Sequence, residues 1–235
     1  IKRHKGVFAI SSLLLPVFAL AAVTLMAIRS SSPALNENQN MDARSTVVVL
    51  SKTPDASKDL LYLSNGIADD TVRALVQIDN LNVVSRRASE RFEDHDNLIQ
   101  TLKSEFNVDY VLEISAKQQA QEKIISADLI DADSQLLLSS TNFLASNLSS
   151  QSQLALILTD ELNIRIHPEK REEMFRHGTE SATAYDYYLK GRHLIKNWHK
   201  PDSDGGRRSD DVWKANAAFD RALDHDPAFG KAAFH

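Results

Sequence analysis

The alternation of hydrophobic and polar positions divides the chain into three parts. Residues 7–28 form a run of 22 residues without a charge. From residue 46 onward, apolar segments with strand periodicity alternate with segments of helical periodicity, and only helical periodicity remains after Pro168. We therefore expect a transmembrane helix, then an α/β domain, then an all-helical region.

The uncharged run has the length and the flanking charges of a membrane anchor. At 1.5 Å per residue it spans about 33 Å, close to a hydrocarbon core of roughly 30 Å. Lys2, Arg3 and Lys5 precede it and only Arg29 follows it closely, so the positive-inside rule places residues 30–235 outside the cytoplasm. The main alternative is a cleaved signal peptide, whose apolar stretch is usually shorter. We expect a single-pass protein of the inner membrane, with a cytoplasmic basic flank (1–6), a transmembrane helix (7–28), a linker (29–45) and a periplasmic remainder.

Five segments with a strand pattern and three with a helical pattern predict one α/β domain over residues 46–167. In the order βαβαβββα, the strands are expected at 46–50, 81–85, 109–115, 123–130 and 135–143, and the helices at 65–78, 96–106 and 149–166. The early β-α-β units favour parallel strands covered by helices, and the later hairpins add antiparallel strands. The sequence therefore predicts a mixed sheet with packed helices, of α/β or α+β type.

The helix expected at 65–78 has polar residues around its predicted start. Ser64 or Asn65 occupies the position of a cap, and Asp69 and Asp70 would lie near the positive end of the helix. We expect these side chains to stabilise the first turns.

Residues 168–235 carry a pattern typical of tetratricopeptide repeats, which need small residues where two helices touch and a terminal proline. Helices are expected at 181–197 and 209–224, with the start of a third at 229. The candidate packing residues of this repeat are Gly191, Leu194, Ala215, Phe219, Ala222 and Pro227. Because one repeat cannot bury its own face, we expect further repeats after residue 235. Gly191 and Pro227 are 36 positions apart, about twelve more than in a usual repeat, which predicts a polar insertion within residues 197–210.

Two segments of the α/β region, 63–89 and 106–143, resemble the TolB-amino-terminal-like domain, and residues 184–197 and 217–229 resemble the tetratricopeptide region that follows it in related proteins. The combination is similar to membrane-bound transcription activators of the ToxR/CadC type. The resemblance implies a cytoplasmic winged-helix DNA-binding domain before residue 1, a single transmembrane helix and a periplasmic sensor. It implies roles in transcription regulation and signal transduction.

Composition narrows the chemistry that the chain can perform. It contains no cysteine, which excludes disulfides, thiol nucleophiles and cysteine-ligated metals. The net charge is −5, and after the first 29 residues the chain carries 23 basic and 32 acidic residues. An acidic region of this kind is poorly suited to bind phosphates, so we expect no contact with nucleic acid from residues 30–235.

Two groups of side chains could suggest a metal site. Asp128, Asp131 and Asp133 are spaced as in a calcium loop, but the glycine and the glutamate that such a loop needs are missing, and we prefer a solvated hairpin turn. His193 lies near the insertion that contains His199, Asp202 and Asp204, without any known ligand spacing. We expect no metal and no other cofactor.

The remaining candidates are also weak. Trp198 and Trp213 flank the insertion and are expected to be packing anchors rather than exposed recognition residues. Ser85, Arg86 and Arg87 could bind an anion, although a solvated connection after the strand is the simpler interpretation. No nucleophile elbow, phosphate-binding glycine loop or dinucleotide fingerprint occurs. We therefore name no catalytic residue and expect no enzymatic activity from the chain.

These observations lead to one main hypothesis and two alternatives. The main hypothesis is the sensing part of a membrane-anchored transcriptional regulator, which binds other proteins or a small molecule and acts as a homodimer. The junction between the α/β domain and the repeats, and the repeat groove, are its expected interaction surfaces. A further hypothesis is that clustered carboxylates sense pH, because they repel one another when ionised. The alternative is that these acids only form an ordinary, solvated surface. The alternatives are an accessory region of a membrane-bound enzyme such as a nucleotide cyclase, and an envelope protein-binding scaffold.

Overall fold

The computed structural model describes residues 44–52, 59–93, 95–164, 166, 178–198 and 209–233. All of them belong to one compact unit, Arg44–His235. The expected transmembrane helix at 7–28, its flank and most of the linker lie outside the described residues, as do the boundary expected at 167/168 and the core of the insertion. Within the described ranges, no helix has both the length and the apolar character needed to cross a bilayer.

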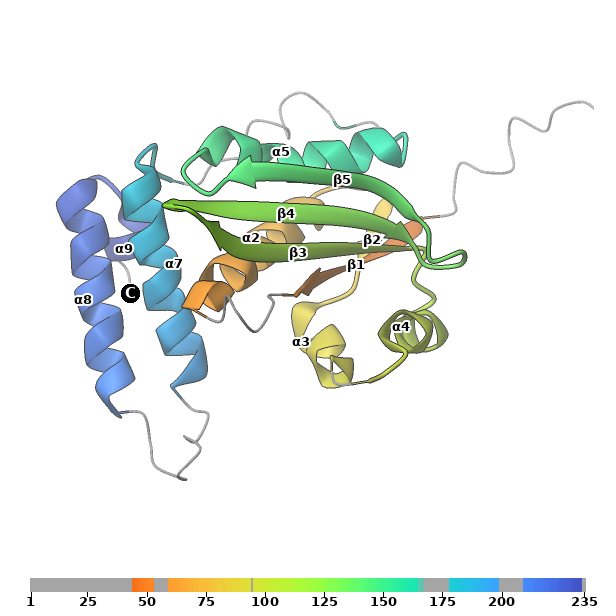
Figure 1. Cartoon of the computed structure of the whole chain (residues 1–235), viewed down its shortest axis with the longest axis horizontal. Coiled ribbons are helices and arrows are strands. Elements are labelled where there is room, and N and C mark those ends of the chain that lie inside the picture. The colour runs from red at the N-terminus through yellow and green to blue at the C-terminus, as the bar shows by residue number, and fades with distance from the viewer. Residues whose placement is uncertain are drawn as a thin grey trace, which may run out of the picture. The chain divides into compact units, whose positions relative to one another are not determined.

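A five-stranded mixed sheet forms the centre of this unit (Figure 1). The strand order is β2-β1-β3-β4-β5, and the strands are β1 (Ser45–Ser51), β2 (Leu81–Val83), β3 (Tyr110–Gln119), β4 (Glu122–Asp131) and β5 (Leu137–Leu144). β1 pairs in parallel with β2 and with β3, whereas β3, β4 and β5 pair antiparallel. The predicted mixed α/β sheet with packed helices is confirmed, including the change from parallel to antiparallel pairing.

Helices cover both faces of the sheet: α2 (Leu61–Leu75) packs on the parallel strands, α5 (Leu148–Glu161) lies beside α2 and β5, and α3 (Arg86–Ser89) and α4 (Leu98–Phe106) lie on the other face near β1. The helices α2 and α5 share a core with Val47 and Val49 of β1. On the other face, Val48 and Leu50 of the same strand pack with residues of α4. Because successive side chains of a strand point to opposite faces, the unbroken apolar run in β1 is the expected pattern for a strand that is buried on both sides.

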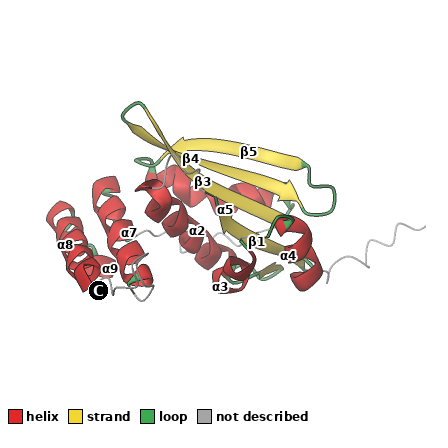
Figure 2. Cartoon of the chain, turned by 60° about the horizontal axis from the view of Figure 1, so that its bottom comes forward, coloured by secondary structure: helices red, strands yellow, loops and turns green. Residues whose placement is uncertain are grey.

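Two antiparallel helices, α7 (Ala182–Asn197) and α8 (Ser209–His225), follow the α/β part, and a short helix, α9 (Gly230–Ala233), comes after them. Figure 2 shows this group of helices next to α2. The N-cap of α7 is Ser181, whose hydroxyl accepts a hydrogen bond of 3.2 Å from the amide of Ala184. α7 packs against two helices, α8 and α2.

The start of α2 differs from the prediction. The helix begins at Leu61, so Ser64 and Asn65 lie inside it, and Asp69 and Asp70 lie in its middle turns. The predicted cap and the predicted interaction with the helix end are therefore wrong. The cause is apolar burial: residues at the start of α2, such as Tyr62 and Leu63, are 7% and 1% exposed and extend the helix toward its N-terminus.

A short helix after β2 was not predicted. α3 (Arg86–Ser89) begins directly after Ser85, whose hydroxyl accepts from the amide of Ala88, and a 3₁₀ helix (Glu90–Phe92) continues it. Only four residues of α3 are helical, too few to give a periodic signal in the sequence. This turn nevertheless brings Arg86 back toward α2.

Candidate functional site

Several polar interactions join α2 and α7. Gly66 of α2 allows the close approach, because a Cβ atom there would lie 2.7 Å from the Cδ2 atom of Leu189 in α7. Leu189 and Tyr185, which face this contact, are 1% and 2% exposed. Around this apolar contact lie two clusters of charged side chains.

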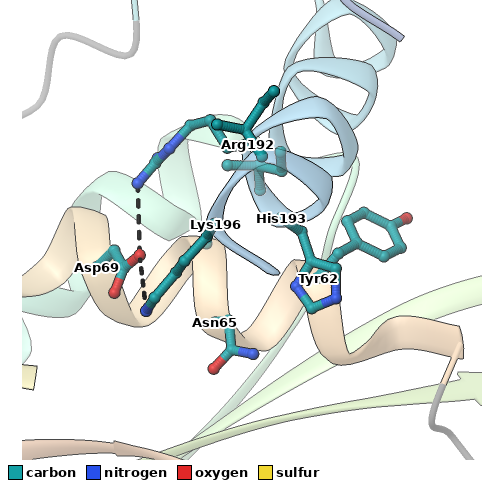
Figure 3. A pocket seen from close by; sticks show the side chains of 9 residues that line it. Tyr62, Asn65, Asp69, Arg192, His193 and Lys196 are labelled. Carbon is teal, nitrogen blue, oxygen red and sulfur yellow. Dashed lines mark hydrogen bonds and ion pairs between the residues drawn. The ribbon is translucent and has the colours of Figure 1, made fainter. Parts of the chain in front are cut away.

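The first cluster is centred on the two aspartates of α2. The Asp69 carboxylate lies 3.3 Å from Nε of Arg86, 3.4 Å from Nη2 of Arg192 and 3.8 Å from Nζ of Lys196. Figure 3 shows Asp69 of α2 facing Arg192 and Lys196 of α7. Asp70 accepts a hydrogen bond of 2.9 Å from Nη1 of Arg192. We call Asp69, Asp70, Arg86 and Arg192 the charge network.

Two further partners of Asp70 strengthen this network. Arg73, one turn further along α2, forms an ion pair with Asp70, and the hydroxyl of Tyr185 in α7 donates a hydrogen bond to it. Burial raises the pKa of Tyr185 above its ordinary value, against the opposing influence of nearby arginines. The phenol therefore remains a hydrogen-bond donor at neutral pH, and Asp70 is bound by α7 through two side chains.

Arg86 attaches α3 to the same network. Its side chain is 8% exposed, donates to the carbonyl of Val49 at 3.3 Å and to Oδ1 of Asn65 at 2.8 Å, and pairs with Glu90 at 3.5 Å. Both interpretations of this arginine from the sequence, an anion site and a solvated connection, are therefore wrong. Glu90 is only one turn away, but Asp69 lies 17 positions from Arg86 in the sequence, so a local pattern does not reveal the buried network. A buried charge that is fully paired in this way is costly to break.

The second cluster connects α7 to the sheet and is centred on Asp186. Its carboxylate accepts hydrogen bonds from the hydroxyl of Tyr62 at 2.6 Å and from Nζ of Lys123 in β4 at 2.8 Å, and pairs with Lys190 at 2.8 Å. Nζ of Lys123 also donates to the Tyr62 oxygen at 2.8 Å. We call these four residues the Asp186 cluster.

The Asp186 cluster favours the ionised form of the Asp186 carboxyl and the neutral form of the Tyr62 hydroxyl. Burial alone would raise the pKa of Asp186, but hydrogen bonds from Lys123, Lys190 and Tyr62 outweigh it and hold the pKa below the usual 3.8. Burial, and then the charge of Asp186, raise the pKa of Tyr62 above its ordinary value. At neutral pH, Asp186 is therefore an anion and Tyr62 a neutral donor.

Two hollows flank α7. The smaller, of about 170 Å³, lies between α2 and α7 and includes Asn65, Asp69, Arg192, His193 and Lys196 in its wall (Figure 3). Since Arg192 and Lys196 there both face Asp69, the positive charge in its wall is largely neutralised within the protein.

The larger hollow, of about 420 Å³, lies between the start of α2, α7 and α8, and we call it the groove. It is lined by Asp59, Tyr62, Tyr187, Lys190, His193, Leu194, Lys214, Ala217, Ala218 and Arg221. Three of these residues are cations and one is an acid. Lys190 and Lys214 pair with acids of their own helices, whereas Arg221 has no ion pair with any other described residue. The groove therefore combines an apolar wall with one cation, Arg221, that is not neutralised by an ion pair with another described residue.

The candidate repeat residues lie mostly between α7 and α8. A Cβ atom on Gly191 would lie 2.5 Å from Cε1 of Phe219, so the glycine allows the ring to pack against α7. Phe219 is 4% exposed, and Ala215 and Ala222 are completely buried. Leu194 is half-buried and also lines the groove. Pro227, by contrast, is exposed in the turn after α8 and is not part of this contact.

The other sequence candidates do not form a site. Trp213 is 77% exposed, so the prediction that it is a packing anchor is wrong, and Trp198 is 39% exposed. Asp131 accepts hydrogen bonds from the amide and the hydroxyl of Ser134, and Asp128 accepts one from Ser140, as expected for a hairpin turn. Among the side chains that the structure describes, no three His, Asp or Glu residues are arranged to hold a metal ion. His199, Asp202 and Asp204 lie outside this part of the chain.

Comparisons with known proteins give one similar sequence and several distant structures. No family model matches the chain. The putative adenylate cyclase 3 of Rhizobium meliloti (strain 1021) is 25% identical over 177 residues, which cover 74% of this chain and 28% of the cyclase. The chain thus spans less than a third of the length of this relative. The resemblance to ToxR/CadC-type regulators rests on the sequence motifs alone.

The similar solved structures share only part of the fold. TolB from Acinetobacter baumannii is 14% identical with a TM-score of 0.37, and the match covers 52% of this chain and 29% of that one. Lipoprotein GNA1162 from Neisseria meningitidis is 18% identical with a TM-score of 0.31, covering 51% and 98%. The LpoB C-terminal domain from Salmonella enterica is 13% identical with a TM-score of 0.30, covering 45% and 85%. TM-scores this low do not support an inference about function.

The Asp186 cluster predicts how stability depends on acid pH. The pKa of Asp186 is lower in the folded state than in the unfolded chain. The contribution of this carboxylate to the free energy of unfolding is therefore fully present above about pH 4, and it is lost as the pH falls through the pKa that Asp186 has in the folded protein. Urea unfolding of the wild type and of Asp186→Asn from pH 3 to pH 7 should therefore give a constant stability difference at pH 5–7 that shrinks below pH 4. Asp160→Asn, which replaces an exposed aspartate, is the control and should show no such change. A stability difference between wild type and Asp186→Asn that grows on acidification would contradict the assignment.

Proposed function

We propose that the chain is the ligand-binding part of a membrane-anchored signalling protein, without catalytic activity of its own. The observation that carries this proposal is the groove, which is open to solvent and is formed by helices from both parts of the unit. Its apolar wall and the cation Arg221, which has no ion pair with another described residue, fit an anionic partner with apolar side chains, such as an acidic peptide segment. Binding there would contact α2 of the α/β part and α8 of the helical part together.

The position of the groove gives binding a route to the rest of the unit. Tyr62 and Lys190 belong both to the groove wall and to the Asp186 cluster. A ligand carboxylate that paired with Lys190 would compete with Asp186, and so would act on the contact between α7 and β4. Differential contact of this kind is what a ligand needs in order to shift a conformational equilibrium.

The location outside the cytoplasm is part of the same proposal and rests on the uncharged run at 7–28 with its basic flank. A signal from the groove would then reach the cytoplasm through one transmembrane helix. In the first candidate, the output is a cytoplasmic DNA-binding domain, as the resemblance to ToxR/CadC-type regulators implies.

A second candidate output is a nucleotide cyclase domain. It is favoured by the similarity to the putative adenylate cyclase 3 of Rhizobium meliloti (strain 1021), of which this chain matches 28%. In that case the chain would be an accessory region that binds proteins or ligands beside the catalytic domain. The sequence encoded upstream of residue 1 distinguishes the two candidate outputs. A winged-helix pattern of about 100 residues would support the DNA-binding domain, and a cyclase domain would support the enzyme.

Binding in the groove can be tested with a defined probe. A fluorescein-labelled peptide of alternating glutamate and leucine should bind the full chain in detergent, measured by fluorescence anisotropy, and a lysine–leucine peptide should not. Lys214→Glu/Arg221→Glu should raise the Kd about tenfold or more, because it reverses two cations of the groove. The control Arg87→Glu/Lys117→Glu makes the same charge change at exposed positions of α3 and β3. Equal losses in both variants, or no binding of the acidic peptide, would reject the groove as the site.

The proposed location can be tested with a reporter enzyme. Alkaline phosphatase fused after His235 should be active in intact cells, since it forms its disulfides only outside the cytoplasm. Leu15→Lys/Leu20→Lys should abolish this activity, because each lysine disfavours insertion by about 2.5–3.5 kcal/mol at the centre of a helix. Two results would refute the anchored arrangement. One is activity of a reporter that works only in the cytoplasm when it is fused after His235, and the other is a mature protein that lacks its first thirty residues.

A further inference from the structure

The turn from β4 to β5 presents three consecutive leucines to solvent. Leu136, Leu137 and Leu138 are 65%, 58% and 46% exposed. Scattered apolar residues are normal on a protein surface, but an exposed run of three is unfavourable in water and is expected only where it has a function. We call these three residues the leucine tip.

The backbone of the turn fixes the leucine tip in its exposed position. The amide of Asp131 donates a hydrogen bond of 3.0 Å to the carbonyl of Leu136, which closes the turn. The pairing of β5 with β4 then shifts by one residue at Leu138, the extra residue of a bulge. Neighbouring residues of a regular strand face opposite sides, but the bulge interrupts this alternation, and Leu137 and Leu138 are both exposed.

The leucine tip lies at the end of the sheet where β1 begins (Figure 1). Val47 of β1 pairs with Tyr110 of β3, and Tyr110 pairs with Asp131, the last residue of β4 before the turn. β5 is three strand spacings, about 14 Å, from β1. The same end contains Val76, which is 63% exposed and lies between α2 and β2, the strand whose first residue pairs with Ser45.

The turn at the opposite end of these strands is polar. β3 and β4 are joined through Gln119, Ala120, Gln121 and Glu122, which are all exposed. Both turns connect antiparallel strands and both are open to solvent, so the position of a turn in the fold does not account for the leucines. The exposed apolar run is a property of one end of the sheet.

The sequence brings the expected membrane anchor close to that end. The uncharged run ends at Ile28 and β1 begins at Ser45, so the 16 residues 29–44 separate them. A chain of that length extends at most about 55 Å, and a random coil of the same length spans about 22 Å. The opposite turn is about 33 Å further away, because β3 and β4 each have ten residues. A bilayer that holds the anchor is therefore within reach of the leucine tip, and the tether raises its effective concentration there.

The acids of the turn have partners within the protein. The carboxylate of Asp131 accepts hydrogen bonds from the amide and the hydroxyl of Ser134 at 2.7 and 2.8 Å, and Asp133 pairs with Lys103 of α4. Interfacial segments bury apolar side chains about 5–10 Å into the boundary between headgroups and acyl chains, with their polar groups at headgroup level. The leucines and the polar turn beside them match this division, and the absence of excess positive charge among these residues favours zwitterionic lipid.

We propose that the leucine tip docks on the lipid bilayer that holds the anchor and inserts its three side chains at the headgroup boundary. The proposal rests on the membrane-anchored arrangement proposed above and adds a second point of attachment. Two attachments restrict the orientation of the sheet relative to the bilayer, which one linker alone does not. The groove remains accessible, because its residue Tyr62 is bonded to Lys123 at the other end of β4.

Quenching by lipid tests the contact directly, because the chain has no cysteine of its own and a single one can be labelled. Leu137→Cys and the control Gln121→Cys, in the opposite turn, each carry the dye NBD in the full chain, reconstituted in phosphatidylcholine nanodiscs. With nitroxide lipid labelled near the headgroup end of the acyl chain, the dye at position 137 should be quenched at least about threefold more than the dye at position 121.

The possible results separate this proposal from the anchor. Equal quenching at both positions in a chain that copurifies with the discs would overturn the contact of the leucine tip and leave the anchor standing. A dye at position 137 that becomes brighter without being quenched by lipid would indicate contact with protein, and would also overturn it. A chain that does not copurify with the discs would overturn the anchor and this proposal together.

A pair of aspartates tests whether the leucines cause the contact. In the chain labelled at position 137, Leu136→Asp/Leu138→Asp should reduce the quenching to the level of the dye at position 121, because ionised carboxylates resist burial in lipid. The control Gln119→Asp/Gln121→Asp adds the same charge in the opposite turn and should leave the quenching unchanged. Circular dichroism and thermal unfolding show whether both variants are folded. Quenching that persists in Leu136→Asp/Leu138→Asp, or that the control also abolishes, would overturn the proposal.

Discussion

The structure depends on the interaction of Asp69 and Asp70 in α2 with Arg192 in α7. These side chains are each less than one-fifth exposed, so their charges have lost much of their contact with water. Such desolvation is tolerated only where the charges are paired and hydrogen-bonded. Arg86 extends the network to α3 and to the carbonyl of Val49 in β1, so that one set of charges joins the sheet and three helices.

The network fixes the geometry on which the proposed function rests. The groove has walls from α2, α7 and α8, and its shape exists only while α7 is held against α2. The Asp186 cluster adds a second attachment, from α7 to Lys123 of β4. Because Tyr62 and Lys190 take part in both the cluster and the groove wall, occupation of the groove changes interactions that hold the two parts together.

The sequence predicted the elements whose pattern is local and missed the features that depend on distant partners. The strand at 123–130 was recognised because Ile125, Ala127 and Leu129 alternate with polar residues, and all three are nearly or completely buried. The change from parallel to antiparallel pairing followed from the order of the elements. Both results come from periodicity and connectivity, which a single sequence contains.

The missed features share one physical cause. Asp69 and Asp70 were assigned to a helix end because acids favour that place, but the start of α2 is decided by the burial of Tyr62 and Leu63. Arg86 was assigned to solvent because its partners Asp69 and Asn65 lie 17 and 21 positions away. The junction was expected to be an interaction surface, but its chemistry could not be derived from a helical pattern that gives no information about charge pairing between helices.

A double-mutant cycle on Asp70→Asn and Arg192→Gln tests most directly whether charge pairing holds α2 and α7 together. Urea unfolding at pH 7 gives the free energy of unfolding of the wild type, both single variants and the double variant. The two side chains are 2.9 Å apart and largely buried, so the account predicts a coupling energy of about 1–3 kcal/mol. Additive effects, with a coupling below about 0.3 kcal/mol, would contradict it.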